Sequence, residues 1–197
     1  MRLVVGMTGA TGAAIGIRLL EVLSVLGVET HLVLSRWARA TIELETGNTV
    51  RQVQALATRS YGHQEQAAAI SSGSFRTDGM IVAPCSMKTL AAIRIGYGEG
   101  LIPRAADVTL KERRRLVLVP RETPLSEIHL DNMLALARMG TVMVPPMPAF
   151  YNRPAGLPDI VDHTVARVLD QFGLDNDLTT RWEGPSTART TDKENTA

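Results

Sequence analysis

Charged side chains gather between Arg104 and Glu122, where a cationic predicted helix leads into an apolar strand that ends on an Arg-Glu pair. Arg104 and Lys111 have helical spacing and so project from one face of that helix. Arg121 and Glu122 follow the apolar run 116–120, which is typical of a strand buried on both faces. Ligands of open α/β sheets gather beyond the carboxyl ends of the strands. The stretch therefore predicts a phosphate site, although a solvated charged helix beside a core strand would show the same pattern.

Small and hydroxyl-bearing residues follow the earlier predicted strands. The turn TGATG (8–12) joins a strand at 3–7 to a helix. This arrangement presents backbone N–H groups to a phosphate, but tight turns also need small residues for steric reasons. Ser35 is a good N-cap after the strand 29–34, and the segment SMKT (86–89) opens a helix after the strand 80–83. Lysine is unfavourable at the positive end of a helix unless an anion lies there too.

The second predicted strand bears on the kind of nucleotide. A NAD-binding fold usually has an acidic residue at the end of this strand to hold the ribose. Ser35 and Arg36 stand there instead. The sequence thus argues against NAD and leaves mononucleotides open.

The elements that must position these residues alternate along the chain. Five apolar strands (3–7, 29–34, 80–83, 116–120 and 141–144) are separated by helices. This order predicts an α/β fold, a flavodoxin/Rossmann-like doubly wound parallel sheet in three layers. Right-handed crossovers place every strand-to-helix turn on one edge. That edge should collect Thr11, Ser35, Ser86, Arg121, Glu122 and Tyr151, the last carried there by the stiff segment PPMPAF (145–150). We expect a single domain over residues 1–182 and a polar, disordered tail at 183–197.

Composition limits the remaining function classes. The 197 residues carry a formal charge of +1, so no global field favours nucleic acid. One cysteine, Cys85, excludes an intrachain disulfide and suits a reducing cytosol, which predicts a cytoplasmic protein. The first apolar run is too short for a signal peptide or a membrane span. No grouping of His or spaced Asp residues suits a metal, so we expect none.

Six motifs together resemble a known family. They are GMTGATGAAIGIRLL, SSGSF, PCSMKTL, RAADVTLKERR, PRETPL and PAFYNRP, in that order over roughly residues 1–182. In this combination the chain resembles the UbiX-type flavin prenyltransferases, including members encoded beside aromatic acid decarboxylases as their B subunits. The resemblance implies metal-independent joining of a dimethylallyl group, from dimethylallyl phosphate, to reduced FMN. It also implies delivery of prenylated FMN to a partner decarboxylase of the aromatic acid type, and a large homo-oligomer such as a dodecamer.

The resemblance assigns roles to particular positions. Residues implied to hold FMN are Gly9, Ala10, Thr11, Ser35, Ser86, Met87, Lys88, Thr89 and Arg121. Those implied to hold dimethylallyl phosphate are Arg104, Lys111, Tyr151 and Arg167. Glu122 and Thr11 are implied to be catalytic, with Glu122 as the proton shuttle. On its spacing alone, Arg167 would instead be a snorkelling side chain or a partner of Asp170.

Two positions depart from the family pattern, and two other functions stay open. Thr11 stands where many relatives have serine, and Gln66 where some carry a tryptophan near the prenyl group. The first alternative is an FMN-dependent decarboxylase of cysteine-derived substrates, but PCSMKT and SRWARAT lack the Asn and His typical of that class. The second is a non-catalytic FMN-binding accessory subunit of a decarboxylase. Such a carrier would not need Glu122, Lys111, Tyr151 and Arg167 together. The sequence does not distinguish a monophosphate donor from a diphosphate one.

Overall fold

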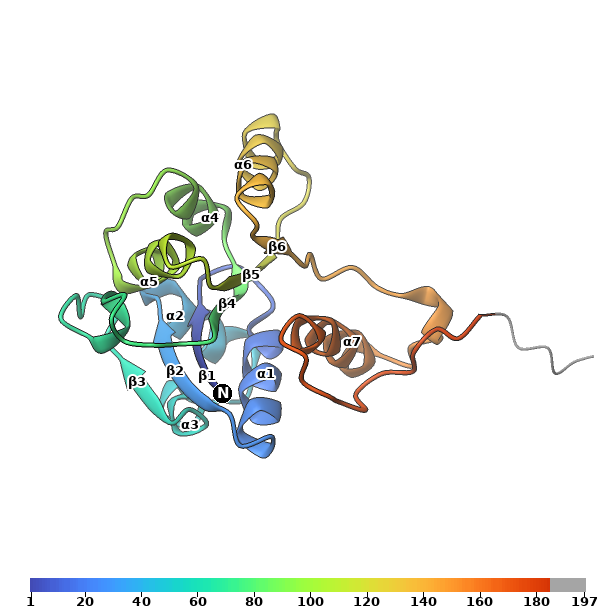
Figure 1. The fold of residues 1–197 in the computed structure, drawn as a ribbon. Coiled ribbons are helices and arrows are strands. Elements are labelled where there is room, and N and C mark those ends of the chain that lie inside the picture. Colours follow the sequence, from blue (N-terminus) through green and yellow to red (C-terminus); the bar gives the residue numbers. More distant parts are fainter. Residues whose placement is uncertain (185–197) are drawn as a thin grey trace, which may run out of the picture.

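A parallel β-sheet between two helical layers forms the frame of the computed structural model, which describes residues 1–184 (Figure 1). The strand order is β3-β2-β1-β4-β5-β6. The strands are β1 (Arg2–Met7), β2 (Glu29–Leu34), β3 (Arg59–Tyr61), β4 (Gly79–Cys85), β5 (Arg115–Pro120) and β6 (Val142–Met143). The order reverses between β1 and β4, so the predicted doubly wound sheet is confirmed.

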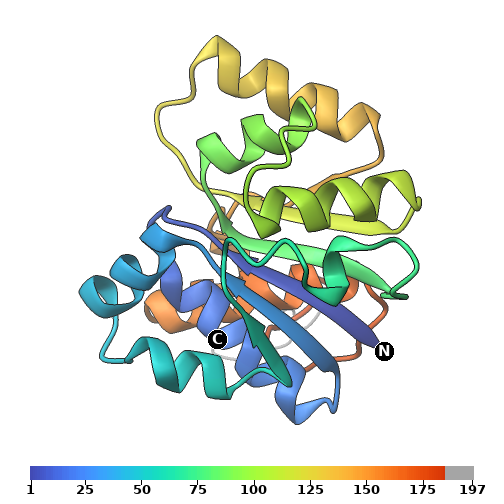
Figure 2. The ribbon, with the colours of Figure 1, turned by 90° about the vertical axis from the view of Figure 1, so that its left-hand side faces the viewer.

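The helices cover both faces of this sheet (Figure 2). One layer holds α1 (Ala13–Val25), α2 (Arg36–Glu45), α3 (Val50–Ala55) and α7 (Leu157–Asp170). The other holds α4 (Met87–Arg94), α5 (Leu101–Lys111), α6 (Glu127–Arg138) and the 3₁₀ turn η1 (Ala69–Ser71). A second 3₁₀ turn, η2 (Phe150–Asn152), lies in the long connection from β6 to α7. The two layers bury separate apolar clusters, one on each face of the sheet.

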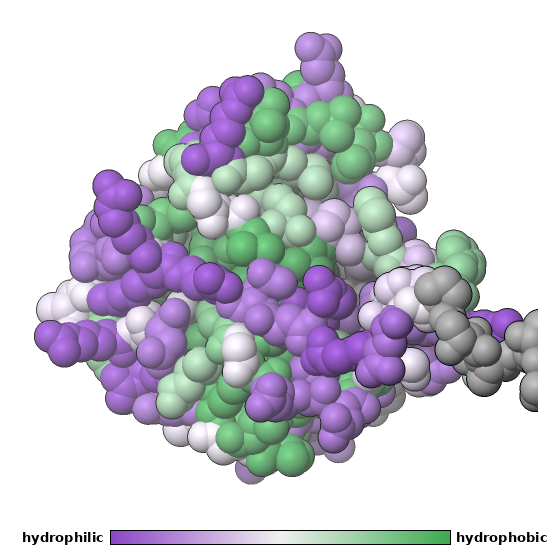
Figure 3. Space-filling view, turned by 45° about the vertical axis from the view of Figure 1, so that its right-hand side comes forward, coloured by the Kyte–Doolittle hydropathy of each residue, from purple (hydrophilic) through white to green (hydrophobic). Residues whose placement is uncertain are grey.

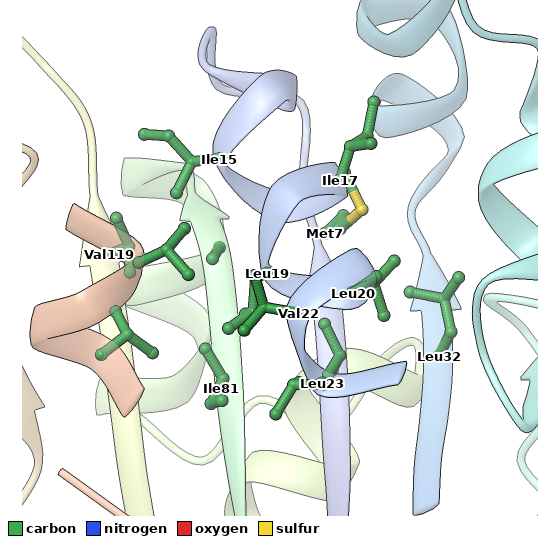
Figure 4. Close-up of a cluster of buried hydrophobic side chains, with 14 of the residues drawn as sticks. Met7, Ile15, Ile17, Leu19, Leu20, Val22, Leu23, Leu32, Ile81 and Val119 are labelled. Carbon is green, nitrogen blue, oxygen red and sulfur yellow. The ribbon is translucent and has the colours of Figure 1, made fainter. Parts of the chain in front are cut away.

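Helix α1 lies closest to the centre of the sheet. Its buried residues Ile15, Leu19 and Leu23 face β1 and β4 (Figure 4). A Cβ atom added at Gly16 would lie 2.4 Å from the carbonyl oxygen of Ala83. Because backbone cannot yield at that distance, glycine is what lets α1 approach the sheet so closely.

The sequence missed one strand and overestimated another. Strand β3 (RSY) has no apolar run, yet it pairs with β2 through residues 59–61 and buries Tyr61. Strand β6 was expected over 141–144 but covers only two residues. Both are edge strands with a single neighbour in the described sheet, so pairing rather than apolar character defines them.

Helix α6 begins after Ser126, which caps it in a reciprocal capping box with His129. Of its apolar residues, Leu136 is buried while Ile128 and Leu130 are more than half exposed. Hydrophobic atoms therefore reach the surface at the top of the molecule, where Figure 1 places α6 (Figure 3).

Residues beyond Gly184 lie outside the described part of the chain, and with them most of the predicted tail at 183–197. No helix within residues 1–184 has the length and apolar character needed to cross a membrane.

A charged cluster lies where β1 and β2 begin. The carboxylate of Glu29 is 2.8 Å from Nε of Arg2 and 2.9 Å from Nε2 of the buried His31. Hydrogen bonds from Arg2 and then from His31 lower the pKa of Glu29 to about 2. The depressed pKa means that Glu29 stabilises the fold above its unfolded pKa of about 4.5, and that this contribution is lost as the pH falls towards 2.

We expect Glu29→Gln to weaken the fold at neutral pH and to have little effect near pH 2. Because Glu29 is partly exposed, the difference should be about 1 kcal/mol or less. The measurement is the free energy of unfolding of both proteins in urea between pH 2 and pH 7. A difference that stays constant over this range would contradict the role of the Glu29 charge.

We expect Gly16→Ala to destabilise the protein by about 1–3 kcal/mol, because the added methyl group forces α1 away from the sheet. Helix propensity alone predicts the opposite, a gain of about 1 kcal/mol. Urea unfolding of Gly16→Ala measures the difference, and Ser24→Ala at an exposed position of the same helix is the control. A stabilised Gly16→Ala protein would show that the close approach is not a constraint.

Candidate functional site at the carboxyl edge of the sheet

The buried hydroxyl of Thr8 joins the turns that follow β1 and β4. Its Oγ1 donates a hydrogen bond to the carbonyl of Pro84 at 2.8 Å and accepts one from the backbone N–H of Ser86 at 2.7 Å. The backbone N–H of Thr8 also donates to Pro84, at 3.1 Å. Thr8 has no predicted role, because nothing in the sequence around a threonine in a turn indicates which groups its hydroxyl will bond.

Two further backbone bonds bring the neighbouring turns into the same edge. The N–H of Ser35, after β2, donates to the carbonyl of Met7. The N–H of Arg121, after β5, donates to the carbonyl of Cys85. The turns after β1, β2, β4 and β5 are therefore fixed against one another, and the predicted convergence of Thr11, Ser35, Ser86, Arg121 and Glu122 is confirmed.

Two helices point their N-termini at this edge. Ser35 caps α2 by accepting from the N–H of Ala38 at 3.0 Å, as predicted. Ser86 caps α4 by accepting from the N–H of Thr89 at 3.3 Å. Lys88 lies exposed in the first turn of α4. A lysine beside the positive end of a helix makes this a place where an anion is stabilised.

Gly9 makes the turn after β1 narrow. A Cβ atom at this position would lie 2.3 Å from Cβ of Trp37, in the first turn of α2. Gly9 is thus needed for the approach of α2 to the edge. Ala10 and Thr11 follow in the same turn, and Thr11 is exposed.

Glu45, at the last position of α2, occupies the N-terminus of α1. Its Oε2 accepts hydrogen bonds from the N–H groups of Gly12 at 2.8 Å and Ala13 at 2.9 Å. Burial alone would raise the pKa of this carboxyl group. Hydrogen bonds from Thr11, Ala13 and Gly12, with the nearby charge of Arg121, outweigh burial and hold the pKa below its ordinary value.

The contact of Glu45 with the start of α1 was not predicted, because its hydrogen-bond partners lie about 30 positions earlier in the chain. Its position changes one expectation. The N–H groups at the start of α1 already bond a carboxylate, so a phosphate would find free donors at α2 and α4 instead.

Arg121 and Glu122 lie exposed just past β5. Oε1 of Glu122 accepts a hydrogen bond from the N–H of Thr123 at 3.0 Å. Met87, by contrast, packs partly buried against the apolar cluster on the α4 side of the sheet. Met87, one of the residues predicted to hold FMN, therefore also supports the core.

The helix α5 carries two of the residues implied to hold dimethylallyl phosphate. Arg104, in its first turn, donates to the carbonyl of Ser71 at 3.2 Å and pairs with Asp107 at 2.7 Å. Lys111, at its last position, pairs with Glu112. The two cations are about 10 Å apart along the helix axis. The SSGSF loop thus holds Arg104 in place, a role that its polar composition did not reveal.

The other two lie on the opposite side of the sheet. Arg167, on α7, pairs with Asp170 at 2.7 Å, as its spacing had suggested. The ring of Tyr151, in η2, meets the rings of His163 and Trp182 edge-on, with centroids 6.2 Å and 5.5 Å away. Tyr151 therefore packs with α7 and Trp182 rather than with the turns after β1, β2, β4 and β5, which corrects the expected common edge.

The four residues implied to bind dimethylallyl phosphate do not form one cluster within the chain. Helix α5 belongs to the layer with α4 and α6, and α7 to the layer with α1 (Figure 2). The sheet separates them. Sequence spacing could not show this, because it does not tell on which face a crossover helix packs.

Two further polar residues support loops. Gln66 lies exposed in the loop after β3 and donates a hydrogen bond to the carbonyl of Gly98 at 3.1 Å. Arg114 donates hydrogen bonds to the carbonyls of Gly73 and Phe75 in the SSGSF loop. Within residues 1–184, no group of three or more His, Cys, Asp or Glu side chains could hold a metal ion.

Comparison with known proteins identifies the family. The Flavoprotein family model matches residues 1–169. The protein named "Probable UbiX-like flavin prenyltransferase" in Streptomyces sp. (strain D7) is 70% identical over 96% of this chain and 95% of its own length. This chain belongs to the UbiX-like flavin prenyltransferases. Flavin prenyltransferase UbiX of Escherichia coli (strain K12) is 55% identical over 93% of this chain and 98% of its own.

Solved structures support the assignment to the UbiX-like flavin prenyltransferases. A dodecameric, FMN-dependent UbiX-like decarboxylase from Escherichia coli O157:H7 has a TM-score of 0.92 at 67% identity, covering 93% of this chain and 100% of its own. AnUbiX (PadA1), in complex with FMN and dimethylallyl pyrophosphate, has a TM-score of 0.92 at 58% identity, with 93% and 97% covered. The cysteine decarboxylase TvaF, at 19% identity and a TM-score of 0.59, shares the fold alone.

Removal of the Glu45 carboxylate should free the backbone N–H groups at the N-terminus of α1. We expect Glu45→Ala to lower the free energy of unfolding by about 1 kcal/mol, since two N–H groups lose a charged acceptor but gain water. Inorganic phosphate should then raise the melting temperature of Glu45→Ala more than that of the parent protein, because the freed donors accept an anion. Glu43→Ala, on the same helix, is the control. An equal response to phosphate in all three proteins would contradict this account.

Proposed function

We propose that this chain joins the dimethylallyl group of dimethylallyl phosphate to reduced FMN and releases prenylated FMN. The observation that carries the proposal is the carboxyl edge of the sheet, where two capped helix N-termini, Lys88 and Arg121 lie beside the Thr11-Glu45 pair. The relative bound to FMN and dimethylallyl pyrophosphate, at 58% identity, supports both ligands.

The residues present suit FMN. The N-termini of α2 and α4 offer backbone donors and hydroxyls for its phosphate, with Lys88 to balance the charge. Arg121, Thr11, Gly9 and Ala10 belong to the turns after β5 and β1, and we propose that they contact the flavin ring. Bound and reduced, FMN supplies the electron-rich ring that accepts the five-carbon group.

The chain's own residues have three tasks in this reaction. Cations stabilise the phosphate as it leaves, because a separating oxyanion needs preorganised positive charge. Arg104, Lys111 and Arg167 are assigned to this task. Tyr151, with its neighbour Trp182, forms an aromatic wall that keeps water from the allyl cation. Glu122, exposed at the edge beside Arg121, accepts the proton lost at the reacting ring.

The position of the cations on opposite faces of the sheet favours an assembled site. Because the residues of α5 and of α7 lie in separate layers, we propose that different subunits contribute them to one phosphate. Apolar surface for such contacts is present on α6 and on the β6–α7 connection, where Ile128 is 72% and Phe150 80% exposed. The dodecameric relative supports an oligomer of this kind.

Further parts of the function are predictions from the sequence. Prenylated FMN would pass to a partner decarboxylase of the aromatic acid type. The donor is the monophosphate in this proposal, and the diphosphate is the competing choice. In this proposal the reaction needs no metal. The single cysteine is consistent with a cytoplasmic protein.

The direct test supplies the purified protein with reduced FMN and dimethylallyl phosphate in the presence of EDTA. Mass spectrometry should show a flavin heavier by one five-carbon unit. A parallel reaction with the diphosphate decides the donor. Unmodified FMN with both donors would overturn the proposal, and would leave the accessory-subunit alternative.

We expect Glu122→Gln to bind FMN like the parent protein but to lower kcat by about 100-fold or more, because the amide cannot accept a proton. Flavin absorbance measures binding, and the mass-spectrometric assay measures turnover. Glu127→Gln, at the start of α6, is the control at an exposed position nearby. Normal turnover in Glu122→Gln would remove this residue from the mechanism.

A further inference from the structure

A cavity of about 280 Å³ lies between β6 and α7. Val142, Val144 and Pro145 give it an apolar side, while His163 and Arg167 line it from α7. Sites for drug-sized ligands range over roughly 300–1,000 Å³, and this cavity lies just below that range, so it suits a ligand smaller than a drug molecule. His163 and Arg167 are one helical turn apart and therefore lie next to each other on the same face.

Two hydrogen bonds fix the ring of His163. Nδ2 of Asn152 and Oγ1 of Thr179 each lie 3.1 Å from Nδ1. With Asn152 oriented so that its Nδ2 faces the ring, which leaves Oδ1 of Asn152 without a hydrogen bond, Nδ1 is the acceptor and we assign the ring proton to Nε2. Within residues 1–184 no group forms a hydrogen bond with Nε2. His163 thus holds one N–H donor free beside the cavity.

The charge around the cavity favours an anion. Arg167 pairs with Asp170, but the same carboxylate also binds Arg181 through both of its oxygens. Arg181 also lies near Asp175 and Asp177, so the positive charge at the cavity is that of Arg167, and no carboxylate is among the residues that line the cavity. Arg167 is itself about half exposed, so its guanidinium can reach a ligand without being buried.

The protonation state of His163 is consistent with a donor role. Burial and then the charge of Arg167 lower the pKa of His163, while Asp170 acts weakly in the other direction. The imidazole is therefore neutral near pH 7 and keeps the proton on Nε2. Tyr151 meets the same ring edge-on at 6.2 Å, so His163 lies next to both Arg167, assigned to the leaving phosphate, and Tyr151, assigned to the aromatic wall.

We propose that Nε2–H of His163 binds the phosphate of dimethylallyl phosphate together with Arg167. This inference rests on the proposed function and adds a residue to it. When the carbon–oxygen bond of the ester breaks, the bonding pair stays on oxygen, and the phosphate carries more negative charge until it takes a proton from water. A fixed N–H donor stabilises that charge. His163 keeps its own proton, because losing it would leave an imidazolate.

Two substitutions test this role in the FMN-loaded full chain. His163→Phe keeps a ring of similar size without the donor, and should lower kcat/KM for dimethylallyl phosphate about 10- to 100-fold. His163→Gln places an amide N–H near the position of Nε2 and should retain most of the activity. His63→Phe is the matched control and should behave as the parent protein. FMN binding should be unchanged in all three.

A chemical measurement on the unmodified protein is independent of turnover and of the folding of any variant. Diethyl pyrocarbonate labels accessible histidine nitrogens, and peptide mass spectrometry reports each site. Dimethylallyl phosphate should slow the labelling of His163 but not that of His63. Inorganic phosphate tried alone shows whether the phosphate end is sufficient.

The outcomes separate this inference from the proposed function. An active parent protein with normal kcat/KM in His163→Phe, or equal labelling of His163 with and without dimethylallyl phosphate, overturns the role of His163 and leaves the transferase function intact. A parent protein that forms no prenylated flavin overturns the function instead. In that case protection of His163 would still support phosphate binding at the cavity.

Discussion

The reversal of strand order between β1 and β4 is the constraint on which the site depends, and the Thr8 hydroxyl holds its two sides together. At this point the crossovers lead to opposite faces, so the helices diverge and the edge stays open for a ligand. A buried hydroxyl that both donates and accepts leaves none of its partners unsatisfied. The turns after β2 and β5 are bonded to the same strand ends, through Ser35 and Arg121. The candidate FMN site is therefore positioned by hydrogen bonds between the ends of the strands rather than by any single loop.

The same sheet also divides the chain's cations. Arg104 and Lys111 belong to the layer of α5, and Arg167 belongs to the layer of α7. The proposed function therefore requires assembly of subunits to bring the two sets together. Apolar residues exposed on α6 and around Tyr151 offer a surface for such contacts. Under this proposal, oligomerisation completes the active site and is not only a source of stability.

The fold class and the convergence of the turns could be predicted from the sequence. Strand β3, the role of Glu45 and the separation of the cations could not, and each has a physical reason. Buried strands such as 116–120 are continuous apolar runs, so the fold class and the convergence of turns followed directly. Strand β3 was missed because an edge strand of three residues is defined by its partner. Glu45 was missed because its bonds to the start of α1 are tertiary. The separation of Arg104 from Arg167 depends on which face each helix covers, and spacing within a helix does not contain that information.

The measurement that tests the shared site most directly mixes two inactive proteins. Lys111→Ala and Arg167→Ala are each expected to lose turnover, and are co-expressed or refolded together. If different subunits supply the two cations, about a quarter of the sites in a random mixed oligomer contain both, and activity returns to about that fraction of the parent protein's. If one subunit supplied both, every site would lack one cation. A mixture as inactive as its components would contradict the account.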